Sequence, residues 1–305
     1  MLRNALKTIK VMDGETHDEN QYLNLIKDIL SEGELVSGRN GNAKTIYGSA
    51  MHFSLDNGTI PLLTTKKVAW KTCLKELIWF ISGSTNNDEL TKQGVKIWNG
   101  NGSRDFLDSR GLSHYRENDL GPVYGHQWRF FNAEYSTCDA EYKGSGVDQL
   151  QNIINDLMDP EKRTSRRMVM SAWNPCQLNE MALPPCHVLV QFNVLNGNKL
   201  SCSLYQRSGD VGLGVPFNIA SYSFLTHLIA KHCGLEASEF LYYLGNTHIY
   251  DDHLEVLSEQ VTRKPYIFPK LIIKSKKEKI EEYIADDFVI ENYNYHSPIK
   301  MEMRK

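Results

Sequence analysis

Apolar residues recur along the chain at two spacings, one typical of helices and the other of strands. Helical spacing predicts helices over residues 21–33, 70–84, 147–160, 216–234 and 251–263. Alternating or β-branched segments predict strands over residues 45–55, 166–173 and 240–250, and a hairpin over 187–207 with Asn196-Gly197 at its turn. The polar, glycine-rich stretch from Asn99 to Gly121 predicts a long surface loop. Together these elements predict an α+β fold, mostly a single domain, with a central antiparallel or mixed sheet.

Composition narrows the class of protein. The chain has 305 residues, of which 41% are hydrophobic, enough to bury a sizeable core. No stretch approaches the roughly 18 to 20 consecutive apolar residues of a membrane span. The first twenty residues lack the apolar centre of a signal peptide, so we expect a cytosolic or nuclear location. A net charge of −3 with intermixed acids and bases argues against a general nucleic-acid surface.

The cysteines indicate neither disulfides nor a metal site. The six of them are scattered, without a C-x-x-C pair or zinc-like spacing: Cys73, Cys138, Cys176, Cys186, Cys202 and Cys233. In a long chain without a secretion signal, free thiols are the default, and we expect no bound metal. Each cysteine is then either a buried core residue or a nucleophile.

The stretch ALPPCHVLVQF places Cys186 at the entry of a predicted strand. If the hairpin turn has two residues, cross-strand partners have numbers that sum to 393, and Cys186 lies opposite Arg207, where a guanidinium can stabilise a thiolate. A turn of three residues shifts the partner to Ser208. The neighbouring His187 points to the other face of an ideal strand, which argues against a direct role as general base. The alternative is an ordinary buried thiol beside a proline kink.

Downstream of Arg207, the segment RSGDVGLGVPFN leads into a predicted helix. Its three glycines permit close backbone approach to a ligand, and Ser208 together with a helix N-terminus suits a phosphate. A plain strand-to-helix connection explains the same pattern. Asn218, an amide within an apolar run, can donate and accept hydrogen bonds and so read the edge of a base. A buried structural asparagine is the alternative.

Three further features are candidates for binding or catalysis. Arg166 and Arg167 are adjacent and point in different directions, so a phosphate shared across a dimer interface is one interpretation, and a solvated charge cluster is the other. His248 and Tyr250 lie two residues apart on one strand face, a suitable pair for hydroxyl recognition. Glu76 is a lone acid on an apolar helix, either a carboxyl with a raised pKa or a structural acid with satisfied hydrogen bonds.

Six motifs carry a resemblance to a known family. They are LPPCH, LYQRSGDVGLGVPFNIASY, GPVYGHQWR, KELIWFISGSTN, PLLTTKK and GNTHIYDDH. In order and spacing, from about residue 20 to the C-terminal tail, they resemble thymidylate synthases of the eukaryotic or large-virus type. The resemblance implies one catalytic domain over residues 1–305, with an N-terminal extension over 1–19 and a mobile tail over 298–305. It also implies a large twisted mixed sheet with packed helices, and a homodimer formed through that sheet.

The family methylates dUMP to dTMP with 5,10-methylenetetrahydrofolate as cosubstrate. Carbon 5 of uracil is a poor nucleophile, so a thiolate adds at carbon 6 and converts the ring into an enolate. The resemblance implies these catalytic residues: Cys186 as nucleophile, Glu76, Tyr124, Arg207, Asn218 and Asp210. It implies these dUMP-binding residues: Arg39, Arg166 and Arg167 from the other subunit, Gln206, Arg207, Ser208, Gly209, Asp210, Asn218, His248 and Tyr250. It implies these folate contacts: Ile97, Trp98, Asn101, Asp210, Leu213, Gly214 and Phe217.

Two departures from the family keep other functions open. The loop GRNGNAKTIYG is one residue shorter than the usual arginine loop, and the chain ends IKMEMRK where the family typically ends Met-Ala-Val. Because a charged tail is costly to bury unpaired, water can replace hydride at the methylene intermediate, as in the related hydroxymethylases. Trp98 favours the synthase over a deoxyuridylate hydroxymethylase, and Asn218 favours uracil over cytosine. A catalytically impaired nucleotide- or RNA-binding homologue is the alternative of another class.

Overall fold

The computed structural model describes residues 17–38 and 40–304. Its helices are α2 (Asn20–Glu32), α3 (Trp70–Ile81), α4 (Asn87–Lys92), α5 (Asn99–Gly102), α6 (Arg104–Ser109), α7 (Tyr124–Phe130), α8 (Gln149–Met158), α9 (Gly214–Cys233) and α10 (Leu254–Gln260). Its strands are β1 (Glu34–Gly38), β2 (Gly41–Ser54), β3 (Val169–Ser171), β4 (His187–Leu195), β5 (Lys199–Asp210), β6 (Glu236–Tyr250), β7 (Lys270–Ile273) and β8 (Phe288–Glu291).

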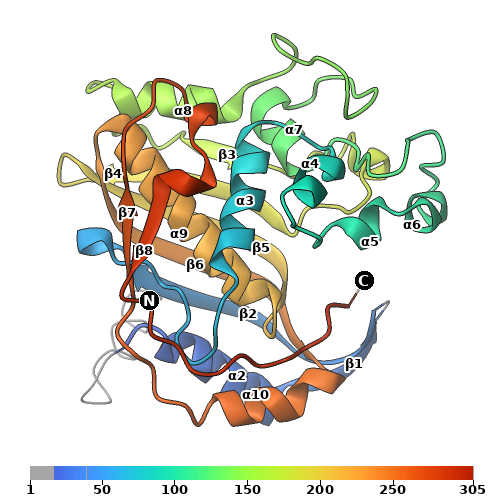
Figure 1. Ribbon diagram of the computed structural model, residues 1–305, viewed down its shortest axis with the longest axis vertical. Helices are drawn as coiled ribbons and strands as arrows, with labels where there is room; N and C mark the ends of the chain where they lie inside the picture. The colour runs from blue at the N-terminus through green and yellow to red at the C-terminus, as the bar shows by residue number, and fades with distance from the viewer. Residues whose placement is uncertain (1–16, 39, 305) are drawn as a thin grey trace.

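A six-stranded sheet organises the molecule (Figure 1). The strand order is β1-β2-β6-β5-β4-β3, and β7 pairs with β8 in a separate hairpin. Strands β5 and β6 run parallel, whereas every other neighbouring pair in the large sheet is antiparallel. The predicted single-domain α+β fold with a large mixed sheet is therefore confirmed.

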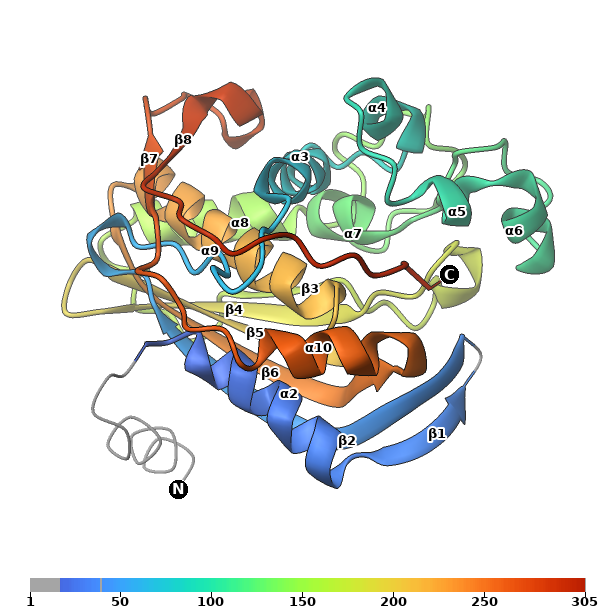
Figure 2. The ribbon, with the colours of Figure 1, turned by 60° about the horizontal axis from the view of Figure 1, so that its bottom comes forward.

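Helices cover one face of this sheet. Helix α9 is buried on nearly all sides and packs on β5 and β6, while α3 packs on α9. Gly234 ends α9 with φ of 71°, a left-handed cap that glycine adopts without strain. In Figure 2 the C-terminal segment, in dark red, runs from β8 past α10 along this helical side. None of the described helices combines the length and hydrophobicity needed to cross a membrane.

The opposite face of the sheet carries exposed apolar side chains. Leu189 on β4 pairs with Tyr205 on β5, and these side chains are 36% and 38% exposed. Val169 on β3 is 42% exposed. Their sequence neighbours Met170, Val190 and Leu204 are buried, as alternation along a strand requires. This face of the sheet therefore exposes several apolar side chains to solvent.

The hairpin has Asn196-Gly197 at its turn as predicted, and of the two turn lengths left open the structure has three residues, Asn196 to Asn198, because β4 ends at Leu195 and β5 begins at Lys199. Two other predictions about local structure were wrong. The predicted surface loop between Asn99 and Gly121 contains α5 and α6, which are too short for their apolar periodicity to be read. The strand predicted over 166–173 extends only over β3, with Arg166 and Arg167 in the turn before it.

Candidate active site

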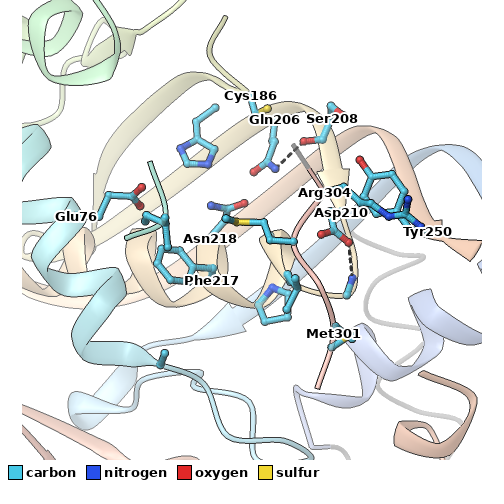
Figure 3. Close-up of a pocket in the computed structure, with 18 of the residues that line it drawn as sticks. Glu76, Cys186, Gln206, Ser208, Asp210, Phe217, Asn218, Tyr250, Met301 and Arg304 are labelled. Atoms are coloured by element: carbon cyan, nitrogen blue, oxygen red, sulfur yellow. Dashed lines mark hydrogen bonds between the residues drawn. The ribbon is translucent and has the colours of Figure 1, made fainter. Parts of the chain in front are cut away.

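A cavity of about 560 Å³ lies at the end of the central strands, between the sheet, α3, the start of α9 and the C-terminal tail. Figure 3 shows Glu76 on one side, Asp210, Tyr250 and Arg304 on the other, and Asn218 between them. The sequence-predicted residues that line the cavity are Glu76, Ile97, Trp98, Asn101, Tyr124, Cys186, Gln206, Arg207, Ser208, Asp210, Leu213, Gly214, Phe217, Asn218, His248 and Tyr250. Motifs far apart in the sequence therefore meet at one place.

Cys186 is held through its backbone at the entry of β4. Its amide donates a hydrogen bond to the hydroxyl oxygen of Tyr124 at 2.7 Å. Its carbonyl oxygen accepts one from the amide of Arg207 at 2.9 Å. The Arg207 side chain donates from Nε to the carbonyl of Pro185 at 2.8 Å and from Nη2 to the carbonyl of Pro184 at 2.9 Å. The two prolines and the arginine thus fix the only cysteine that lines the cavity among the described residues.

The side of the cavity next to α3 holds a buried acid. The pKa of the Glu76 carboxyl is raised to about 7 by burial, and the hydrogen bond from Trp98 Nε1, 2.7 Å from Oε1, opposes that rise. Burial also raises the pKa of the Tyr124 hydroxyl, so Tyr124 stays protonated near neutral pH. A carboxyl that titrates near pH 7 can give and take protons at the pH of the cell.

His187 is buried beside Tyr124, with 5.0 Å between the two ring centroids. Burial lowers the pKa of its imidazole to about 4, and a hydrogen bond with Asn218 opposes this shift. At neutral pH the ring is therefore uncharged, and it supports the amide of Asn218 rather than carrying a proton. Asn218 itself is buried on the first turn of α9 and lines the cavity.

The far end of the cavity is polar. The amide of Gln206 is oriented by two hydrogen bonds: Nε2 donates to the carbonyl of Ser208 at 2.7 Å, and Oε1 accepts from the hydroxyl of Tyr242 at 2.6 Å. His248 and Tyr250 stand together on β6, with ring centroids 5.1 Å apart. Parallel pairing of the strands sets Asp210 beside His248. Donors and acceptors thus converge at this end of the cavity.

Four predicted residues do not line this cavity or are not described. Gly209 does not line the cavity, and a Cβ there would come within 2.7 Å of Leu244 Cδ2 and 3.0 Å of Val215 Cγ2, so any larger residue would require those side chains to shift. Arg166 and Arg167 are exposed and do not line the cavity of this chain. Arg39 lies outside the described residues.

Some residues that line the cavity were not singled out from the sequence. Lys66 is buried, and its Nζ donates a hydrogen bond to the carbonyl of Gly212. Burial lowers the pKa of its ammonium to about 7, although the charges of Asp210 and Glu19 oppose this. The others include Asn40, Phe80, Met301 and Met303. Lys67, in the motif PLLTTKK, and Arg304, in the charged tail, also line the cavity. Both lysines belong to the motif PLLTTKK, which could have identified them. The local sequence does not indicate that Lys66 is buried.

The arrangement supports nucleophilic addition to a planar, phosphorylated ligand. It combines a fixed cysteine, a buried acid that titrates near neutrality, an amide on a helix start and a polar end. Trp98 and Phe217 offer flat surfaces, and Ile97 and Leu213 apolar contacts, to a second, aromatic ligand. Among the described residues, no cluster of three or more His, Cys, Asp or Glu side chains is arranged to hold a metal ion.

Comparisons with known proteins agree with this geometry. A family model for thymidylate synthase matches residues 20–305. The chain is 54% identical over 289 residues to a thymidylate synthase of Homo sapiens, covering 94% of this chain and 91% of that protein. It is 52% identical over 290 residues to one from Equine herpesvirus 2, covering 94% and 99%. It is 49% identical over 302 residues to one from Saccharomyces cerevisiae, covering 96% and 99%.

Proposed function

The chain belongs to the thymidylate synthase family, and on that premise we propose that it methylates dUMP to dTMP with 5,10-methylenetetrahydrofolate. The observation that carries the proposal is the convergence of Cys186, Glu76 and Asn218 on one cavity. The folate supplies both the one-carbon unit and, as hydride, the electrons that reduce it. The protein's part is to activate the uracil ring, to move protons and to exclude water.

Activation of the ring begins at Cys186. Its sulfur adds to carbon 6 of the uracil, and the displaced electron pair moves through carbon 5 to the oxygen on carbon 4 as an enolate. The amide of Asn218 reads the uracil edge and donates a hydrogen bond to the oxygen on which negative charge develops. Carbon 5 is now nucleophilic enough to attack the one-carbon unit of the cosubstrate. Loss of the proton from carbon 5 and departure of tetrahydrofolate leave an exocyclic methylene, which hydride from tetrahydrofolate reduces to methyl, giving dihydrofolate. Sulfur then leaves carbon 6, so the cysteine is regenerated.

Proton transfers fall to Glu76 and Tyr124. A carboxyl with a pKa of about 7 exchanges protons with the ring oxygen and with water at little cost near neutral pH. Tyr124 keeps its proton, and its hydroxyl oxygen already accepts the amide hydrogen of Cys186. In the proposed complex, the phenol lies near carbon 5, from which a proton departs.

The polar end of the cavity suits the sugar phosphate of dUMP. Arg207 and Ser208 supply a positive charge and a hydroxyl for the phosphate, with Gln206 oriented beside them. His248 and Tyr250 offer donors and acceptors to the ribose hydroxyl. On the folate side, Ile97, Trp98, Asn101, Leu213, Gly214 and Phe217 form the contact set, and Asp210 hydrogen-bonds the amide of Gly212 next to it at 2.9 Å.

A homodimer through the open face of the sheet completes this proposal. Exposed Val169, Leu189 and Tyr205 supply the apolar contact area. Arg166 and Arg167 lie in the turn before β3, beside this face, and are exposed. In a two-fold dimer they extend from one subunit to the phosphate of its partner.

Methyl rather than hydroxymethyl is the expected product. The case for a hydroxymethylase depended on a charged tail that is costly to bury unpaired. Arg304 is instead about one-third exposed and paired with two carboxylates, and the relatives named above are synthases. Trp98, held by Glu76, closes the side of the cavity where the intermediate is sheltered.

Identifying both products of one incubation tests the function. The enzyme is mixed with dUMP and 5,10-methylenetetrahydrofolate, and the nucleotide and folate products are separated by mass. We expect dTMP and dihydrofolate in equal amounts. Hydroxymethyl-dUMP with tetrahydrofolate identifies a hydroxymethylase. Binding of dUMP without turnover supports the non-catalytic homologue.

A further inference from the structure

The C-terminal tail ends in an ion pair with the turn that follows β6. Arg304 Nη2 lies 3.0 Å from Asp251 Oδ1 and 2.9 Å from Asp252 Oδ1. Its guanidinium carbon is 5.7 Å from the centroid of the Tyr250 ring, a residue that lines the cavity. One arginine is therefore held by two carboxylates and an aromatic face.

The residues just before Arg304 cover the cavity. The carbonyl of Glu302 accepts a hydrogen bond from His253 Nε2 at 2.9 Å. Met301 and Met303 line the cavity, and Met301 Sδ lies so close to Gly212 that a Cβ there would be 3.1 Å away. Figure 3 shows the tail crossing the cavity between Met301 and Arg304.

We propose that Arg304 is a positioning residue, whose ion pair with Asp251 and Asp252 holds the tail over the bound folate so that Met301 and Met303 exclude water. This inference depends on the proposed function. Arg304 acts through the tail and makes no contact with the reacting atoms.

The strength of this contact is suited to a tail that must open and close. Exposed ion pairs stabilise weakly one at a time, and salt screens them. Here the side chain of Arg304 is 33% exposed and those of Asp251 and Asp252 are 43% and 39% exposed, so little is lost by removing the charges from water. Two carboxylates and Tyr250 act on the same guanidinium. The closed tail is then favoured several-fold without being locked.

Removing the Arg304 charge tests the proposal through the folate. The variant is Arg304→Met, and the matched control is Lys300→Met, since Lys300 is an exposed cation on the same tail. We expect the folate KM of Arg304→Met to rise about three- to tenfold, with unchanged dUMP binding and a larger fraction of hydroxymethyl product. Raising salt should increase the folate KM of the wild type but not of this variant. Arg304→Lys keeps the charge, so its folate KM should lie between those of the wild type and Arg304→Met.

A second experiment removes the two carboxylates that pair with Arg304. Asp251→Asn combined with Asp252→Asn should reproduce the Arg304→Met effect, and all three changes together should add little, because one interaction has been removed. Equal folate KM, product ratio and salt dependence in Arg304→Met and Lys300→Met overturn the proposal.

Hydrogen exchange separates this proposal from the proposed function. In the ligand-free protein, the backbone amides of residues 301–304 should exchange about three- to tenfold faster in Arg304→Met than in Lys300→Met. That measurement needs no turnover. Faster exchange in a protein that never makes dTMP would refute the synthase activity and leave the ion pair's role intact. Unchanged exchange in an active enzyme would refute the role of Arg304 alone.

Discussion

Arg207 contacts the chain on both sides of the Cys186 sulfur. Its backbone amide donates to the carbonyl of Cys186 at 2.9 Å, and its guanidinium donates to the carbonyls of Pro185 and Pro184. A single residue therefore fixes the chain around the proposed nucleophile and brings a positive charge to the polar end of the cavity. These two contributions can be separated by experiment.

Replacing Arg207 with lysine keeps the charge but loses the planar fork that reaches both proline carbonyls. We expect Arg207→Lys to lower kcat by about 10- to 100-fold, because the two side-chain hydrogen bonds that fix the chain before Cys186 are weakened or lost. Arg207→Ala should also raise the KM for dUMP. Steady-state kinetics measure kcat and the KM for dUMP. Arg116→Lys is the control, because Arg116 is an exposed arginine outside the cavity. A normal kcat in Arg207→Lys would mean that only the charge matters.

The nucleophile itself is tested by Cys186→Ala. Without the thiol the uracil ring cannot become an enolate, so we expect turnover to fall by about 10⁴-fold or more while dUMP still binds. Mass spectrometry of the denatured wild-type mixture should show a nucleotide bound to the peptide that contains Cys186. Cys176→Ala, at an exposed cysteine, is the control and should retain activity. Turnover in Cys186→Ala would remove this residue from the mechanism.

Glu76 makes the stability of the protein depend on pH. The folded protein keeps the proton on Glu76 up to about pH 7, whereas the unfolded chain releases it near the ordinary pKa of 4.5. Because the folded state binds more protons between these values, its free energy of unfolding falls as pH rises through this window. Glu76→Gln removes the burial penalty. Its free energy of unfolding relative to wild type should therefore be larger at pH 8 than at pH 5, by up to about 3 kcal/mol.

Denaturant unfolding of the ligand-free proteins at the two pH values measures this difference. Glu255→Gln, at an exposed acid on α10, controls for loss of a charge. In the wild type we expect the turnover rate to change with pH near 7, where Glu76 titrates. In Glu76→Gln this pH dependence should be absent. A stability difference that is the same at pH 5 and pH 8 would contradict the raised pKa.

The sequence predicted the pairing of Cys186 with Arg207 correctly, but from a two-residue turn that the structure does not have. The turn has three residues, which by itself shifts the partner of Cys186 to Ser208. A bulge between His187 and Leu189 shifts the register back by one, and His187 pairs with Gln206. Alternation of apolar residues cannot reveal a bulge, because an extra residue is visible only where the partner strand is known.

The long elements and the motifs could be predicted, whereas contacts between distant short segments could not. Helix α9 and the central strands have enough residues for their periodicity to be read. The ion pair of Arg304 with Asp251 joins residues 53 positions apart, and no local pattern specifies it. The burial of Lys66 likewise depends on Gly212 and Tyr22, which lie far from it in sequence. Their places follow only from the folded chain.

Base recognition is tested at Asn218. A carboxylate there accepts hydrogen bonds but cannot donate one to the uracil oxygen, and it suits the amino group of cytosine. We expect Asn218→Asp to lower kcat/KM for dUMP by about 100-fold or more and to bind dCMP more tightly than the wild type does. Asn155→Asp, at an exposed residue of α8, is the control. Unchanged preference for dUMP would assign base recognition to another residue.

The arginines before β3 allow a test of the dimer by mixing inactive subunits. A subunit with Cys186→Ala lacks the nucleophile but still offers its Arg166 and Arg167 to the partner. A subunit with Arg166→Ala and Arg167→Ala keeps Cys186 but offers no arginines. Each variant alone should be inactive or bind dUMP poorly.

In a mixed dimer of these two, one of the two sites combines an intact Cys186 with intact arginines from the other chain. Random exchange makes half of the dimers mixed, so about a quarter of the wild-type activity should return. The activity is followed after unfolding and refolding the two variants together, and the same treatment of each alone is the control. Mixtures with no more than the sum of the separate activities would show that Arg166 and Arg167 serve their own subunit or no site at all. Recovery to about a quarter requires that the phosphate site be shared, because no rearrangement within one chain can supply both missing groups.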